Sequence, residues 1–165
     1  MGFLGPTWYQ GDAELPAGTL AHYTDRHALA RIMQAGVIRP YRALPDDAVP
    51  LVWLSTNGIW EPASGRATPW NPAQPLGFDQ LCAINGGLAR LLVDADVAEL
   101  AWKQLRQLVS PGWVRAAEQP SQSWFKANCH RWYASRHAIG RDHWLGIEVW
   151  RAPRWTPLPY TWEEG

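Results

Sequence analysis

The chain has few of the residues that build covalent or metal-based scaffolds. It contains only two cysteines, Cys82 and Cys129, among 165 residues, too few for a disulfide framework or a cysteine-based zinc site. Lysine is also rare, since Lys103 and Lys126 are the only lysines among 15 cationic side chains. The 15 acidic side chains bring the formal net charge to zero, which argues against nonspecific attraction to nucleic acid or anionic membranes.

Long apolar runs are missing as well. No run of about 18 apolar residues is present, so we expect no membrane-spanning helix. Residues 1–10 lack the basic start and the apolar stretch of a signal peptide, so the expected location is the cytoplasm. The residue in excess is tryptophan, with twelve copies. Tryptophan fills cores, interfaces and sites for planar ligands.

The length and composition predict one globular domain. A chain of this length is typical of a single domain. A content of 47% hydrophobic and 18% charged residues is that of a folded rather than a disordered protein. We expect an irregular lead-in over 1–19, a core over 20–155 and a tail over 156–165.

The hydrophobic pattern predicts five or six strands in an α+β fold. The sheet should be small and mostly antiparallel, split or sandwiched, with helices to one side and an edge strand near the C-terminus. The clearest strands are expected at 20–24, 51–56, 89–94 and 144–150.

Two or three helices are expected between these strands. The first should follow a cap at Thr24 or Asp25 and stop at Gly36. A capping-box pattern of Asp96 with Glu99 predicts a second helix that reaches about residue 108, and a third is expected over 122–137. Residues 57–79 are rich in Pro, Gly and Trp and predict a lid or acceptor loop over a site.

One predicted strand carries the candidate catalytic carboxylate. Strict alternation divides residues 144–150 into an aliphatic face with Leu145, Ile147 and Val149, and a face with Trp144, Gly146, Glu148 and Trp150. Glu148 would then lie between two indoles, with space left by the glycine, where its pKa would be perturbed and it could act on a ligand. The alternative is a solvated glutamate on the outer face of an edge strand.

The first half of the chain supplies candidate binding groups. His22 can bond a ribose hydroxyl, Tyr23 can stack on a flat ring, and Ser55 can bond a ring or a carboxylate. A histidine in a strand can equally be structural. Five arginines could form a basic rim for phosphate or simply a solvated face: Arg131, Arg136, Arg141, Arg151 and Arg154. Cys129, His130 and His137 lack a further ligand at suitable spacing, so no metal is expected.

The order of these pieces resembles that of the ADP-ribosyltransferase superfamily. The sequence His22-Tyr23-Thr24 precedes a capped helix, residues 52–57 follow, and a strand with Glu148 comes late. The chain looks closest to small bacterial and phage-type members and to DNA-targeting toxins, and is more distantly similar to RNA 2′-phosphotransferases. The resemblance covers roughly residues 20–60 and 140–155.

The resemblance implies an ADP-ribosyltransferase-like split sheet and NAD as co-substrate, with no metal. Glu148 would bond the 2′-hydroxyl of the nicotinamide ribose beside the oxocarbenium-like centre, and Ser55 would orient it. These two are the expected catalytic residues, and His22 and Glu148 should face one cleft. The expected NAD-binding residues are His22, Tyr23, Thr24, Trp53, Thr56 and Arg39.

The implied activity is cleavage of the nicotinamide–ribose bond and transfer of ADP-ribose to an unknown acceptor. Separately from the resemblance, we expect a monomer. The acceptor could be nucleic acid, protein or a small molecule, and the role that of a toxin or of defence or counter-defence. Two features depart from the family. Gly146 stands where many members have a second acidic or amide residue, and only Arg39 and Arg42 match a toxin-type arginine by position. The alternatives are a noncatalytic nucleotide- or partner-binding module on the same fold and an NAD glycohydrolase.

Overall fold

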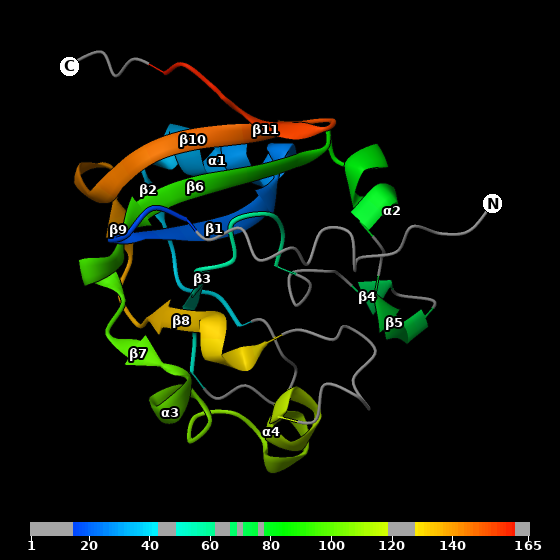
Figure 1. Ribbon diagram of the computed structural model, residues 1–165, viewed down its shortest axis with the longest axis vertical. Coiled ribbons are helices and arrows are strands. Elements are labelled where there is room, and N and C mark those ends of the chain that lie inside the picture. Colours follow the sequence, from blue (N-terminus) through cyan, green and yellow to red (C-terminus); the bar gives the residue numbers. More distant parts are fainter. Residues whose placement is uncertain are drawn as a thin grey trace.

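The centre of the molecule is one antiparallel sheet. The computed structural model describes residues 15–42, 49–61, 67–68, 71–75, 78–118 and 128–160. Within them, seven strands pair in the order β11-β10-β6-β1-β3-β8-β7 (Figure 1). The strands are β1 (Thr19–Asp25), β3 (Val52–Ser55), β6 (Leu88–Asp94), β7 (Leu100–Ala101), β8 (Trp132–Ser135), β10 (Trp144–Arg151) and β11 (Arg154–Pro157).

Smaller elements surround this sheet. Two short pairs are formed by β2 (Val37–Ile38) with β9 (Ile139–Gly140) and by β4 (Ala67–Thr68) with β5 (Asn71–Pro75). The helices are α1 (Arg26–Ala35), α2 (Phe78–Ala83), α3 (Trp102–Leu105) and α4 (Pro111–Glu118), with 3₁₀ turns at Ala95–Val97, Cys129–Arg131 and Arg141–His143. None of the helices described is long and apolar enough to cross a membrane. The helices and the antiparallel sheet together confirm the predicted α+β class with a mostly antiparallel sheet.

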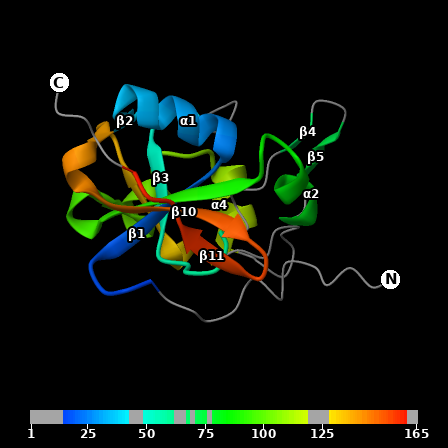
Figure 2. The ribbon, with the colours of Figure 1, turned by 90° about the horizontal axis from the view of Figure 1, so that it is seen from above.

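Helix α1 forms as its caps predict and covers one face of the sheet (Figure 2). The Asp25 carboxylate accepts a hydrogen bond from the Ala28 amide at 2.7 Å, which satisfies a free donor at the helix start. Gly36 ends the helix with φ of 69°, a left-handed conformation that glycine adopts without a Cβ clash. The apolar side of α1 packs on a core of aliphatic strand residues that includes Leu20, Val52, Leu54, Leu91, Val93, Ile147 and Val149.

The opposite face of the sheet is aromatic. Near β3 and β8 it packs against α3 and α4 through four tryptophans, Trp53, Trp102, Trp113 and Trp132. Near β1 and β6 it carries a second cluster built on Tyr23, Trp60, Leu81 and Leu88. Most of the tryptophans that the structure describes thus lie on this face.

Two predicted helices are wrong. The 3₁₀ turn at Ala95–Val97 is capped by Asp94 rather than Asp96, and β7 and the one-turn helix α3 take the place of a longer helix. Of the helix expected over 122–137, residues 122–127 lie outside the described part, and the described remainder contains a 3₁₀ turn followed by β8. Because β8 is paired on both sides, by β3 and β7, tertiary pairing decides its conformation against the local pattern.

Strand β10 contains a bulge that alters its predicted faces. Trp144 pairs with Val93 and Gly146 with Leu92, so Leu145 is the extra residue. Leu145 is 58% exposed, whereas Trp144 is 7% exposed and belongs to the aliphatic core. The assignment of Leu145 to the core and of Trp144 to the side of Glu148 is therefore wrong, while Ile147, Val149 and Glu148 lie on the faces expected.

The bulge makes a direct prediction about stability. Leu145→Ala should change the free energy of unfolding by less than about 0.5 kcal/mol, because the side chain is largely in water. Ile147→Ala, two residues away, should cost about 2–5 kcal/mol through lost burial and a cavity. Urea denaturation of both variants measures the difference. Equal losses would show that β10 is not bulged.

Candidate functional site

The register of the sheet places His22 and Glu148 on opposite faces. Tyr23 pairs with Arg90, which pairs with Glu148, so these three side chains share one face. His22 lies in the neighbouring row with Leu91 and Ile147 and points to the other face, the one under α1. The expectation that His22 and Glu148 face a common cleft is therefore wrong. The physical reason is that neighbouring residues of β1 alternate across the sheet and β6 fixes the register of β1 and β10.

His22 has a structural environment. It is buried, and its Nδ1 lies 2.9 Å from the Trp53 carbonyl oxygen. Since a carbonyl only accepts, Nδ1 carries the proton and donates. Burial lowers the pKa of His22, and the bond to Trp53 offsets this only in part. His22 is therefore a neutral residue that fastens β1 to β3.

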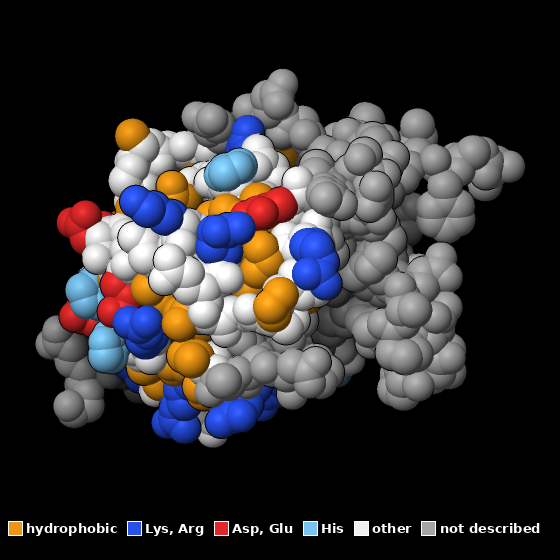
Figure 3. All heavy atoms as spheres, turned by 90° about the horizontal axis from the view of Figure 1, so that it is seen from below, with side chains coloured by type: hydrophobic (Ala, Val, Ile, Leu, Met, Phe, Trp, Pro, Cys, Tyr) orange, Lys and Arg blue, Asp and Glu red, His pale blue; other side chains and the backbone are white. Residues whose placement is uncertain are grey.

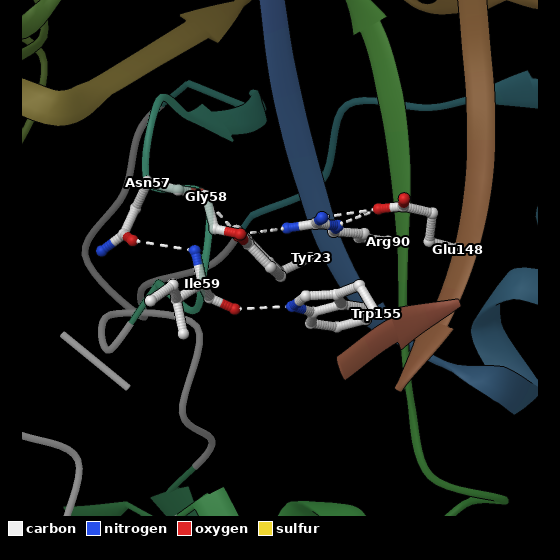
Figure 4. Close-up of polar contacts among 7 residues, drawn as sticks. All are labelled: Tyr23, Asn57, Gly58, Ile59, Arg90, Glu148 and Trp155. Carbon is white, nitrogen blue, oxygen red and sulfur yellow. Dashed lines mark hydrogen bonds and ion pairs between the residues drawn. The ribbon is translucent and has the colours of Figure 1, made fainter. Parts of the chain in front are cut away.

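The Glu148 face holds a buried ion pair at the middle of the sheet (Figure 4). Arg90 Nε donates to Glu148 Oε2 at 2.6 Å, and Nη2 forms an ion pair with the same oxygen, also at 2.6 Å. The Arg90 side chain is 7% exposed and that of Glu148 is 17% exposed. Arg90 Nη1 also donates to the Tyr23 hydroxyl at 3.2 Å and to the Gly58 carbonyl at 2.7 Å. These bonds fix the orientation of the guanidinium and, through it, of the carboxylate.

Aromatic rings enclose this ion pair. The Arg90 guanidinium carbon lies 4.5 Å from the centre of the Trp155 ring, in cation–π contact. Trp155 also contacts Trp150, with ring centres 5.5 Å apart. Burial raises the pKa of Tyr23, and the nearby Arg90 opposes this. The Tyr23 phenol is therefore a neutral hydrogen-bonding group.

The described contacts of the Glu148 carboxylate all involve one of its two oxygens. Among the residues that the structure describes, Arg90 alone bonds its carboxylate, and both bonds go to Oε2. Its aromatic neighbours are Trp150 and Trp155 rather than Trp144 and Trp150. A Cβ at Gly146 would lie 3.8 Å from Leu92, an ordinary contact, so the glycine makes no deep recess beside the carboxylate. The site can therefore present a partly exposed, oriented carboxylate oxygen to a hydroxyl donor.

Ser55 belongs to the same face but orients a different glutamate. It pairs with Ala21 in β1, two residues before Tyr23. Its hydroxyl donates to Glu61 Oε2 at 2.6 Å and accepts from the Asn57 amide at 3.0 Å. Both Ser55 and Glu61 are buried. The structure thus assigns to Glu61, not to Glu148, the contact that the resemblance implied for Ser55.

The other expected NAD-binding residues are dispersed. Thr24 alternates with Tyr23 and so lies on the His22 side of β1. Thr56 donates its amide to the Arg131 carbonyl at 3.0 Å. Arg39 follows β2 and is exposed. Trp53 is half-buried in the tryptophan cluster with Trp113 and Trp132.

Sequence reasoning missed Arg90, Glu61 and Trp155. A signal for Arg90 exists, because it is a cation inside the apolar strand 88–94, and a buried charge requires a partner. Arg90, rather than Arg39 or Arg42, is the arginine that the fold brings to Glu148. Glu61 and Trp155 have no comparable signal in the sequence.

The described part of the molecule contains no cluster suited to a metal ion, and the face in Figure 3 shows no continuous basic surface. No group of three or more His, Cys, Asp or Glu side chains there could hold a metal ion. On the face seen from below, the described Lys and Arg side chains are scattered among apolar, uncharged and acidic ones (Figure 3). The chain matches no protein-family model, no curated protein and no solved structure.

The buried His22 predicts a loss of stability in mild acid. Its pKa is lowered in the folded state, so the unfolded chain, with a histidine pKa near 6.5, binds more protons. The free energy of unfolding should therefore fall as the pH drops below about 6.5. In His22→Asn, whose amide can still donate to Trp53, the fall between pH 7 and pH 5 should be smaller. Urea denaturation at several pH values measures this, and unchanged slopes would contradict a neutral buried His22.

Proposed function

We propose that the chain is an NAD-consuming enzyme of the ADP-ribosyltransferase type, with Glu148 as its catalytic carboxylate. The observation that carries the proposal is the geometry of Glu148. One oxygen is held by Arg90 and the other is left to a ligand, in a partly exposed position beside Trp150 and Trp155. The order of sequence motifs that resembles this superfamily supports the same assignment.

The chemistry requires a carboxylate of this kind. Glu148 Oε1 would accept a hydrogen bond from the 2′-hydroxyl of the nicotinamide ribose. As the bond between C1′ and nicotinamide breaks, nicotinamide leaves with the electron pair, and positive charge develops on the ribose. A fixed negative charge nearby stabilises that centre because the carboxylate does not have to reorient. The acceptor then forms a bond to C1′ through its lone pair, and its proton passes to solvent water.

The proposed site uses one face of the sheet. His22 and Thr24 lie on the other face, so we assign them no contact with NAD. The Tyr23 hydroxyl is already bonded to the Asn57 carbonyl and to Arg90, which makes it a support rather than a stacking surface. Trp150 and Trp155 are half-buried beside Glu148 and supply the aromatic surface that a nicotinamide or adenine ring needs.

A binding module without catalysis is the second candidate. The observation that favours it is that the Arg90–Glu148 pair is satisfied within the sheet and would stabilise it without any ligand. An NAD glycohydrolase differs from the first candidate only in its acceptor, which is water. Release of nicotinamide from NAD would show catalysis, whereas a binding module would release none. Among catalytic outcomes, free ADP-ribose indicates hydrolysis and an ADP-ribosylated acceptor indicates transfer.

Substitution of Glu148 tests the proposal. Glu148→Gln should slow nicotinamide release from NAD about 100–1000-fold per folded molecule, because the amide carries no charge for the developing cation. His22→Asn should stay within about threefold of wild type, since His22 lies on the other face. Chromatographic measurement of nicotinamide and NAD gives the rates.

A matched control comes from the exposed Arg106–Glu118 pair. Glu118→Gln removes the same kind of charge at a distant place and should leave the rate unchanged. Glu148→Gln also leaves the Arg90 guanidinium buried without its counter-charge, so its melting temperature should fall, and the assay is run well below it. Wild type that neither binds nor consumes NAD would end the enzyme proposal. A large rate loss in His22→Asn would contradict the assignment of the site to the Glu148 face of the sheet.

A further inference from the structure

We propose that Arg90 is a positioning residue that couples Glu148 to residues 57–61, which we call the 57–61 segment. This segment begins one residue beyond Thr56, which follows β3, and ends in Glu61. Among the contacts described, Glu148 bonds no residue of the 57–61 segment. Arg90 bonds both Glu148 and Gly58 of the segment. The charge of Glu148 thereby controls the order of a segment that it does not contact.

Three successive carbonyls hold the segment to the sheet. The Asn57 oxygen accepts from the Tyr23 hydroxyl at 2.5 Å, the Gly58 oxygen from Arg90 Nη1 at 2.7 Å, and the Ile59 oxygen from Trp155 Nε1 at 2.7 Å (Figure 4). The donors belong to β1, β6 and β11. A loop fastened at three consecutive residues to three strands is a preformed wall of the Glu148 face.

Arg90 is the residue on which this arrangement depends. Its Nη1 serves both Gly58 and Tyr23, while Nε and Nη2 serve Glu148. The guanidinium is planar, so the bonds to Glu148 also aim Nη1 at the segment. Bonds to a charged carboxylate are about twice as strong as those to a neutral acceptor. Without that charge, the guanidinium loses its main orienting contact.

The segment carries two side chains that lie near Tyr23 and Ser55. Trp60 packs edge-on against Tyr23, with ring centres 5.2 Å apart, and Glu61 is bonded by Ser55. Glu61 and Glu148 both raise the pKa of Tyr23 through repulsion of its phenolate. A loosened segment would therefore displace a second carboxylate near Tyr23. Its effect on catalysis rests on the proposed function, whereas the coupling itself does not.

Hydrogen exchange of the protein without NAD tests the coupling. Exchange in peptides that cover residues 57–61 should be about tenfold faster in Glu148→Gln than in wild type, as expected for the loss of about one charge-assisted bond. Trp155→Phe, which removes one donor to the segment and no charge, should also raise exchange there. Glu118→Gln is the control, with no change in the segment expected.

A second pair of variants separates positioning from simple charge balance. Arg90→Gln should lower the melting temperature and raise exchange in the segment. Arg90→Lys restores a cation beside Glu148 but not the planar fork. It should recover part of the melting temperature without restoring slow exchange. If lysine restores both, Arg90 is only a counter-ion and the inference is wrong.

The outcomes remain distinct from those of the proposed function. Folded Glu148→Gln with wild-type exchange in the segment would overturn the coupling, whatever its NAD turnover. If Glu148→Gln does not fold, Arg90→Lys decides the question by the same measurement. If these variants show fast exchange but the wild-type protein does not consume NAD, the coupling is supported and the enzyme proposal is wrong.

Discussion

The structure depends on the neutralisation of one buried cation. Arg90 lies in β6, between β1 and β10, where water cannot solvate its guanidinium. An unpaired charge there would cost several kcal/mol, so the neighbouring strands must supply acceptors. Glu148 provides the negative charge, and Tyr23 and Gly58 accept the remaining bonds. The register of the three strands and the path of the chain after β3 are tied to this requirement.

This requirement divides the sheet into two faces of different chemistry. The face under α1 is aliphatic, and the polar ring that it contains, His22, is held in its neutral form by burial. The opposite face holds the ion pair, the Ser55–Glu61 pair and most of the described tryptophans. Aromatic rings suit this second face, because they pack as apolar groups and still interact with a cation or donate an N–H.

The same contacts explain how a small sheet could present a reactive carboxylate. Arg90 contacts Glu148 through a single oxygen, so the stabilising contacts do not occupy both carboxylate oxygens. The segment beside it is anchored by Tyr23, Arg90 and Trp155 rather than by strand pairing. Stability and the proposed catalysis therefore both depend on the Arg90 guanidinium.

Local signals in the sequence determined the elements whose ends and faces depend on nearby residues. The caps at Asp25 and Gly36 defined α1, and β-rich runs defined β1, β3, β6 and most of β10. Alternation also placed Glu148 opposite Ile147 and Val149. These features need no information about pairing partners, because capping and alternation act within a few residues.

Only the tertiary structure decided which residues meet. Residues 132–135 became a strand because β3 and β7 flank them, and the bulge at Leu145 arises from pairing with β6. The separation of His22 from Glu148 and the meeting of Glu148 with Arg90 both follow from strand order and register. Register is set by contacts between residues about 60 positions apart, such as Arg90 and Glu148, and a shift of one residue would reverse every face.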